Sequence, residues 1–363
     1  MNTTAISSQP RTIPQLYRGT AEVVGQEPAR RQLAVLLERQ MRIAFDSRWD
    51  KSESAVIFGR TGTGKTYLTK KMCQLTGLPF ADANATTYTE SGYAGQDLSQ
   101  MFLPLLEATA ELLDEESERY AGLPLIERKV RSDESSVLKR EDIDQVVERA
   151  QTGVILLDEM DKWAHRINHH TGRLDTAIQS EFLKIVEGSH VYITDSEDEA
   201  GVLFDTSRVL VICAGAFVGL ANQVLKRLDK EQGYSDSDQF WQMVEQSDFV
   251  RYGLIPELAG RLSKIIFLRP LRKEHLAEII RLPGGPVEEL QERFAEMDCE
   301  WDVPEVAIVQ LADIALKKEV GARGLDSVLW SVFNEALFKA AIADGPSVVS
   351  LRPNQNKASF VTL

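Results

Sequence analysis

Apolar residues form short runs in the first three quarters of the chain. The clearest runs cover residues 55–58, 153–157 and 209–214, and residues 78–83 and 264–268 are predicted to form further short strands. A nearly continuous apolar run of this length indicates a strand buried on both faces, as in a parallel sheet. Between the runs, apolar residues recur every three or four positions and predict amphipathic helices over 28–44, 98–113 and 175–186. The pattern predicts an α/β fold in which helices flank a parallel sheet.

The pattern changes after Pro270, where we expect a domain boundary. Helical spacing then predominates over 273–282, 287–295, 305–318 and 325–341, and a strand is predicted at 348–351. We therefore expect a large domain over 21–268 and a smaller, mainly helical domain over 272–363. Residues 1–20 are polar and are expected to form a loose arm. Residues 114–142 carry mixed charges and are expected to be a solvated insertion.

Composition narrows the class of protein. The 363 residues are 43% hydrophobic and 26% charged, as in ordinary globular domains. No apolar run approaches the roughly 18 residues of a membrane span, and the N-terminus lacks a signal-peptide pattern. Three scattered cysteines form neither a disulfide framework nor a zinc spacing, so we expect a cytoplasmic protein. A net charge of −14 argues against nucleic acid as a partner.

The strongest chemical motif is G-R-T-G-T-G-K-T at residues 59–66, between a predicted strand and a predicted helix. Glycines let the backbone N–H groups curl round an anion, and the helix offers its positive end to phosphate. Lys65 then supplies a charge for the β- and γ-phosphates, and Thr66 a hydroxyl for Mg²⁺. A chance glycine-rich turn is the weaker interpretation, because strand and helix are both present.

A second motif ends the predicted strand at 153–157 with two carboxylates, Asp158 and Glu159. Ligand sites of open parallel sheets lie beyond the carboxyl ends of the strands. Asp158 is therefore expected to hold Mg²⁺, and Glu159 to polarise the attacking water. The alternative is a buried strand followed by solvated acids. His165, His169 and His170 follow, but no further ligand cluster accompanies them, so a metal site there is not favoured.

The order of these motifs resembles the ClpX-type AAA+ ATPases of the Clp/Hsp100 protein unfoldase family, from about residue 13 to the end of the chain. Besides the two motifs above, the match rests on V-V-G-Q at 23–26, T-E-S-G-Y-A-G-Q-D at 89–97, C-A-G-A-F at 213–217, G-L-I-P-E-L-A-G-R-L at 253–262 and V-G-A-R-G-L at 320–325. In that family these segments are the adenine contact, the first pore loop, sensor 1, the arginine finger and sensor 2.

The resemblance implies a homo-hexameric ring that binds Mg-ATP between subunits. Arg261 would reach the neighbour's γ-phosphate, with a surface salt bridge as the alternative. Arg323 would contact the nucleotide of its own chain. The implied catalytic residues are Glu159, Arg261 and Lys65. The implied nucleotide and Mg²⁺ contacts are Val23, Val24, Thr61, Gly62, Thr63, Gly64, Lys65, Thr66, Tyr67, Asp158 and Arg323, with Thr66 and Asp158 holding the metal.

The resemblance also implies protein substrates. Tyr93, with Ala94 and Gly95, would line the central pore, and its aromatic ring would grip side chains of many kinds. The alternative for Tyr93 is a packed loop aromatic. Threading of polypeptide through the pore is therefore the leading hypothesis for function. An AAA+ loader or switch that assembles a protein or nucleic-acid complex is the alternative. A non-hydrolysing scaffold is disfavoured because Glu159 and Arg261 are both present.

Departures from the family pattern shape the expected partners. The scattered cysteines exclude the four-cysteine zinc domain of ClpX, and the Ile-Gly-Phe tripeptide that docks on the ClpP peptidase is absent from 221–252. ClpP is therefore not expected as a partner. A predicted hairpin, 191–193 with 202–204, carries the acidic residues 195–199 where ClpX has a basic loop. Such a change of sign should favour basic substrates. The roles of this loop and of the insertion stay open.

Overall fold

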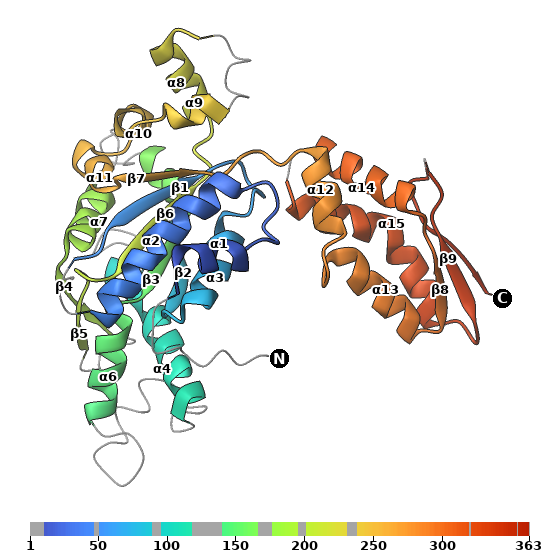
Figure 1. Cartoon of the computed structure of the whole chain (residues 1–363), viewed down its shortest axis with the longest axis horizontal. Coiled ribbons are helices and arrows are strands. Elements are labelled where there is room, and N and C mark those ends of the chain that lie inside the picture. Colours follow the sequence, from blue (N-terminus) through green and yellow to red (C-terminus); the bar gives the residue numbers. More distant parts are fainter. Residues whose placement is uncertain are drawn as a thin grey trace. The chain divides into compact units, whose positions relative to one another are not determined.

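Two compact units make up the computed structural model of the chain (Figure 1). One unit comprises Met1–Thr20, Pro28–Phe58 and Lys65–Phe267, and the other comprises Ala21–Glu27, Gly59–Gly64 and Leu268–Leu363. No helix in the described part of the chain has the length and apolarity to cross a membrane. The structure describes residues 11–46, 51–88, 96–117, 140–165, 176–194, 201–230, 238–318, 321–353 and 355–362.

The first unit is built on a five-stranded parallel sheet with the strand order β2-β3-β6-β1-β7. The three central strands are buried almost throughout, as their apolar runs predict. Helices flank the sheet (Figure 1), which confirms the predicted fold class. The strands are β1 Ser54–Phe58, β2 Phe80–Asn84, β3 Val154–Asp158, β6 Leu210–Gly215 and β7 Lys264–Phe267.

The helices of this unit bury their apolar faces against one core. Asp97 directly precedes the helix predicted over 98–113. It caps the 3₁₀ turn η2 because its carboxylate accepts from Ser99 N at 2.8 Å. The helices are α2 Glu27–Phe45, α3 Lys65–Thr76, α4 Leu103–Ser117, α6 Arg140–Ala150, α7 Ala177–Glu187, α8 Leu220–Leu228, α9 Asp238–Gln242, α10 Gln246–Tyr252 and α11 Pro256–Arg261, with 3₁₀ turns η1 Ala85–Thr87, η2 Leu98–Phe102 and η4 Met160–His165.

An additional helix, α1 (Ile13–Gly19), forms where a loose arm is expected. Pro14 lies in its first turn, where the missing N–H has no partner to lose, and Leu16 is fully buried. Arg30 of α2 also holds α1, because its Nη2 donates to Tyr17 O at 2.6 Å. Burial of Leu16 and the hydrogen bond from Arg30 therefore attach this polar segment to the first unit.

The predicted hairpin is present as β4 (His190–Ile193) paired antiparallel with β5 (Val202–Asp205). Tyr192 and Leu203 lie opposite each other on its exposed face, whereas Ile193 and Phe204 point into the core. The acidic residues 195–199 lie outside the described residues.

Within its described residues, the second unit contains four helices and a three-stranded sheet around its own core. The Trp301 and Phe333 rings stack with centroids 5.2 Å apart, joining the sheet to α15. All four helices and β9 are predicted from the sequence, whereas β8 and β10 are not. The elements are α12 Lys273–Ile280, α13 Pro286–Glu296, α14 Glu305–Lys317, α15 Arg323–Ala341, β8 Cys299–Asp302, β9 Ser347–Ser350 and β10 Ser359–Thr362.

Candidate active site

The turn between β1 and α3 carries the predicted phosphate loop. Gly62 and Gly64 have φ angles of 76° and 95°, a left-handed backbone that residues with a Cβ rarely adopt. Thr63 stabilises the turn because its Oγ1 donates to Arg60 O at 2.8 Å. Thr61 lies exposed within the same turn. The backbone therefore has the curled form that cradles an anion.

Helix α3 starts directly after this loop and presents the next candidate residues. Lys65 is its first residue and is buried, and Tyr67 is more than half exposed. Because Lys65 lies at the N-terminus of α3, an anion placed there would meet both its ammonium group and the positive end of the helix.

The two predicted metal ligands meet in the first unit. Thr66 Oγ1 donates to Asp158 Oδ2 at 3.0 Å, bringing together α3 and the end of β3. The other carboxylate oxygen of Asp158 accepts from Glu159 N at 2.8 Å. A hydroxyl and a carboxylate at this separation form a donor set that suits Mg²⁺, which takes oxygen ligands. The residues present therefore fit the expected metal ion.

Glu159 leaves β3 with an unusual backbone. Its φ is +59°, and its side chain is exposed. A left-handed conformation at a residue other than glycine costs about 1–3 kcal/mol and concentrates at functional sites. An exposed carboxylate on a strained backbone therefore follows directly after the end of β3.

Within the second unit, residues 23–26 pack beside the phosphate loop. Val23 and Val24 are buried. Gln26 is buried as well, and its Nε2 donates to Thr63 O at 3.2 Å and to Arg269 O at 2.9 Å. Sequence reasoning names this segment but misses the role of Gln26, because hydrogen bonds of an amide to distant backbone leave no local signal.

The start of α15 also contacts the phosphate loop within the second unit. Ala322 N donates to Gly62 O at 2.9 Å. Gly321 has a φ of +61°, and an added Cβ there would lie 2.5 Å from Gly62 O. Arg323 follows as the first residue of α15 and is exposed.

Arg261, the predicted arginine finger, ends α11. In this single chain it forms an ion pair with Glu187 at the end of α7, with Nη2 2.6 Å from Oε1. Both side chains are close to half exposed. The surface ion pair that competes with the catalytic interpretation is therefore present, but such exposed pairs contribute only about 0–1 kcal/mol and can be exchanged for a stronger partner.

The predicted sensor-1 strand end surrounds a buried carboxylate. Asp161 accepts from Phe217 N at 3.2 Å and lies against Gly215, the last residue of β6. Burial and the nearby Asp161 charge raise the pKa of Tyr252 to about 12. The His165 ring packs on Tyr252 with centroids 4.6 Å apart. Among the described residues, no group of three His, Cys, Asp or Glu side chains could hold a metal ion.

Comparisons with known proteins agree with this geometry. Residues 50–265 match the AAA domain (Cdc48 subfamily), well over half of the chain. The chain belongs to the AAA family. Residues 271–346 match the C-terminal D2-small domain of ClpB protein. This assignment makes the chain an ATP-hydrolysing enzyme with a nucleotide-binding domain.

Curated relatives of this AAA chain include ClpX subunits. It is 29% identical over 344 residues to "ATP-dependent Clp protease ATP-binding subunit ClpX 2" of Wolinella succinogenes, covering 91% of this chain and 77% of the relative. The ClpX of Treponema denticola is 27% identical over 347 residues, covering 89% and 75%. That of Borrelia duttonii is 29% identical over 342 residues, covering 87% and 71%. The predicted resemblance to a divergent ClpX-type ATPase is confirmed.

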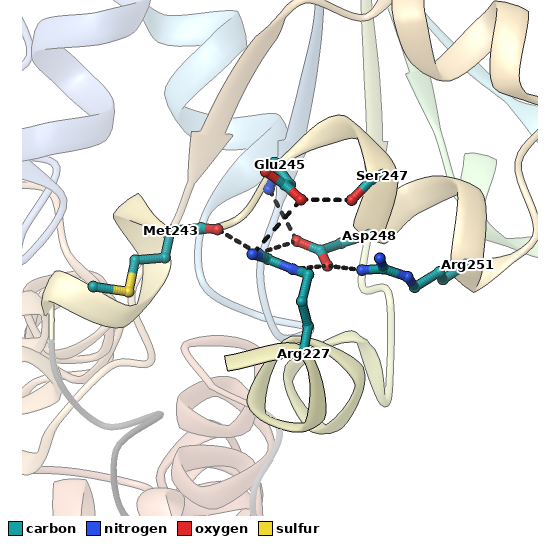
Figure 2. A network of polar contacts seen from close by, with 6 residues as sticks. All are labelled: Arg227, Met243, Glu245, Ser247, Asp248 and Arg251. Carbon is teal, nitrogen blue, oxygen red and sulfur yellow. Dashed lines mark hydrogen bonds and ion pairs between the residues drawn. The ribbon is translucent and has the colours of Figure 1, made fainter. Parts of the chain in front are cut away.

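In this AAA chain, the described residues on either side of 231–237 are joined by a buried ion pair (Figure 2). They belong to 221–252, the stretch in which ClpX would carry its Ile-Gly-Phe tripeptide. Asp248 is fully buried, and both its oxygens accept from Arg227, at 2.8 Å from Nε and from Nη2. Arg251 approaches the same carboxylate, and Glu245 N donates to it. Hydrogen bonding to Asp248 raises the pKa of Arg227. The network joins α8 to α10 across residues 231–237, which lie outside the described residues.

Two further predicted elements of the AAA chain also lie outside the described residues. Tyr93, Ala94 and Gly95 fall within 89–95, and the predicted pore role is untested. On either side of that segment, Gln96 N donates to Thr87 O at 3.4 Å. His169 and His170 lie in another such segment.

Proposed function

We propose that this AAA ATPase is a protein unfoldase or remodeller that works as a homo-hexameric ring and threads polypeptide through its pore. The observation that carries the catalytic part of this proposal is the 3.0 Å hydrogen bond between Thr66 and Asp158. It joins the phosphate-loop helix to β3, which ends at Asp158 and is followed directly by Glu159. The similarity to ClpX subunits over about nine tenths of the chain supports the unfolding of proteins.

The roles at the site follow from the chemistry of phosphoryl transfer. The phosphate loop, Thr61–Gly64, and Lys65 bind the phosphates, and Val23, Val24 and Tyr67 contact the adenosine end. Thr66 and Asp158 hold Mg²⁺, which neutralises charge on the phosphate oxygens. Glu159 orients and deprotonates the attacking water. Arg323 contacts the phosphates from the same chain.

We propose a ring because the γ-phosphate needs a guanidinium from a neighbouring subunit, in addition to Arg323 of the same chain. Charge spreads over the phosphoryl oxygens in the transition state, and a supplied arginine stabilises it. Arg261 lies at the exposed end of α11 and pairs only weakly with Glu187, so it can exchange this partner for the nucleotide of a neighbouring subunit. Assembly and hydrolysis are thereby linked.

The substrates we propose are polypeptides, gripped by Tyr93 and its neighbours Ala94 and Gly95 in the cytoplasm. Residues 221–252 lack the tripeptide used for docking on ClpP, so we propose that this ATPase works without that peptidase. Neither a membrane nor nucleic acid is part of the proposal.

A substrate trap tests the proposal. Glu159→Gln should bind ATP and hydrolyse it about a hundredfold or more slowly, because the general base is lost. Lys65→Ala, which should bind ATP poorly, is the control. Discrete proteins that co-purify with Glu159→Gln only when ATP is present would support threading. Nucleic acid or one fixed partner complex would instead support a loader, and a stoichiometric complex with ClpP would overturn the statement about the peptidase.

A further inference from the structure

Helix α7 holds both ends of α11, the helix that ends in Arg261. Near the start of α7, Gln179 Oε1 accepts from Ile255 N at 2.9 Å, and Ile255 is the N-cap residue of α11. At the end of α7, Glu187 Oε1 accepts from Arg261 Nε at 3.0 Å and from Arg261 Nη2 at 2.6 Å. One helix therefore fixes where α11 begins and where its last side chain points.

The same Gln179 reaches the segment that follows the two catalytic carboxylates. Its Nε2 donates to Trp163 O at 3.1 Å and to Gly253 O at 3.2 Å. Trp163 belongs to η4, which starts directly after Glu159. Gly253 packs so closely on η4 that an added Cβ would lie 2.2 Å from Ala164 O. The side-chain amide of Gln179 thus joins η4, the turn that follows Glu159, to the N-terminal end of α11.

The two contacts differ in strength. Gln179 is fully buried with both ends of its amide satisfied, so removing it would leave buried backbone groups without partners. The Glu187–Arg261 pair is close to half exposed and is screened by water. The base of α11 is therefore firmly held, whereas Arg261 at its tip can be released.

We propose that Gln179 is a positioning residue for Arg261, and that Glu187 is the resting partner of Arg261 until a neighbour's phosphate replaces it. Gln179 links the state of the Asp158–Glu159 segment of one subunit to the arginine offered to the next. This inference rests on the proposed function, since it requires Arg261 to act on a neighbouring subunit.

The test of Gln179 is Gln179→Met, which keeps the volume and removes the hydrogen bonds. We expect kcat in assembled rings to fall about tenfold to a hundredfold, as for an active group misplaced by about 1 Å, with little change in the KM for ATP. The matched control is Gln40→Met. Gln40 is equally buried, and its Nε2 donates to Thr152 O and Arg208 O, both at 2.8 Å, without contacting α11. The control should lose stability and keep its kcat per folded subunit.

Mixed rings separate positioning from general damage. Glu159→Gln subunits hydrolyse poorly but carry an intact Arg261, so mixing them with Gln179→Met subunits should restore hydrolysis at the sites of the latter. Failure of this rescue, or an unchanged kcat of Gln179→Met alone, would overturn the role of Gln179. The Arg261→Ala variant distinguishes a failure of the proposed function from a failure of the inference about Gln179. If it retains the full rate, the proposed trans role itself fails; if it loses the rate and Gln179→Met does not, only the inference fails.

The test of Glu187 is Glu187→Gln, a substitution at an exposed site that should fold normally. Arg261 would no longer have to leave a carboxylate, so we expect the subunit concentration at half-maximal ATPase to fall about two- to fivefold, within the range of an exposed ion pair. The kcat should stay within about twofold. A loss of rate as large as that of Arg261→Ala would show that Glu187 takes part in hydrolysis and would overturn its role as a resting partner.

Discussion

The side-chain amide of Gln26 forms two hydrogen bonds with the backbone of Arg269, as the backbone of a neighbouring strand would. Gln26 Oε1 accepts from Arg269 N at 2.9 Å, and Nε2 donates to Arg269 O at 2.9 Å. The same Nε2 reaches Thr63 O in the phosphate loop. A side-chain amide therefore replaces backbone pairing at the point where the chain leaves β7.

Substitution of this amide should weaken both the fold and the site. Gln26→Leu removes the three hydrogen bonds that this buried amide makes to Thr63 O and to the partly buried backbone of Arg269, so we expect the free energy of unfolding to fall by about 2–4 kcal/mol and the KM for ATP to rise. Denaturant titration and steady-state kinetics measure the two effects. Gln355→Leu is the control, because Gln355 is exposed and its Oε1 accepts from Arg352 N, three residues away. It should change stability by less than about 0.5 kcal/mol.

The close approach of Gly321 to Gly62 should make ATP binding sensitive to one methyl group. Gly321→Ala would push a Cβ to within 2.5 Å of Gly62 O and displace the phosphate loop. We expect the free energy of ATP binding to weaken by about 1–3 kcal/mol, as measured by calorimetric titration. Gly284→Ala is the matched control, since Gly284 has a similar φ of +69° and no atom within 4 Å of an added Cβ. Equal ATP affinities in the two variants would contradict the prediction.

The buried ion pair of Figure 2 should contribute strongly to the packing of α8 against α10. Asp248→Ala leaves Arg227 without its main partner, and we expect a loss of about 3 kcal/mol in the free energy of unfolding. Asp302→Ala is the comparison, because Asp302 pairs with Arg352 on the surface and should contribute at most about 1 kcal/mol. Similar losses in both variants would mean that burial of Asp248 adds nothing to the pair.

Tyr93 offers the sharpest separation of threading from loading. Tyr93→Ala should abolish unfolding of a model substrate and retain ATP hydrolysis, because the grip depends on aromatic contact area. Tyr93→Phe keeps the ring and should keep most of the unfolding rate. A loader without threading should tolerate both changes, so intact remodelling by Tyr93→Ala would exclude the threading mechanism.

The acidic segment 195–199, which follows β4 in the sequence and lies outside the described residues, should influence which substrates are engaged. Replacing Glu197, Asp198 and Glu199 with lysine reverses its charge, so binding of basic peptides should weaken and that of acidic peptides should improve, with basal ATPase unchanged. The control places three lysines in the charged insertion, at Glu115, Glu116 and Glu118. If peptide preferences measured by fluorescence anisotropy are the same in the wild-type protein and both variants, the acidic segment plays no part in substrate choice.

The sequence predicts those parts of the fold that depend on local patterns. The apolar runs of β1, β3 and β6 are continuous because both faces of the strands are buried, and Asp97 lies at a helix start because its carboxylate caps Ser99 N. Strand β8 is missed, since Cys299–Asp302 is short and only partly buried. Its pairing with β9 is a long-range contact that a local pattern cannot reveal.

The candidate site divides in the same way. Lys65, Thr66, Asp158 and Glu159 are predictable because their chemistry dictates spacing along the chain. Gln26 and Gln179 are not, because each acts through backbone groups 243 and 76 residues away. The ion pair between Arg261 and Glu187, 74 residues apart, likewise requires the fold.

Residues Gly59–Gly64 group with the second unit, although the strand before them and the helix after them belong to the first. The chain consequently passes between the two units five times. A fragment that starts at Leu268 would lack Gln26, Gly62 and Thr63 and would leave their hydrogen-bond partners at Arg269 and Ala322 exposed. For chimeras built from related ATPases, the transferable piece is therefore this discontinuous set of three segments, and a graft of the C-terminal third alone would carry an incomplete surface.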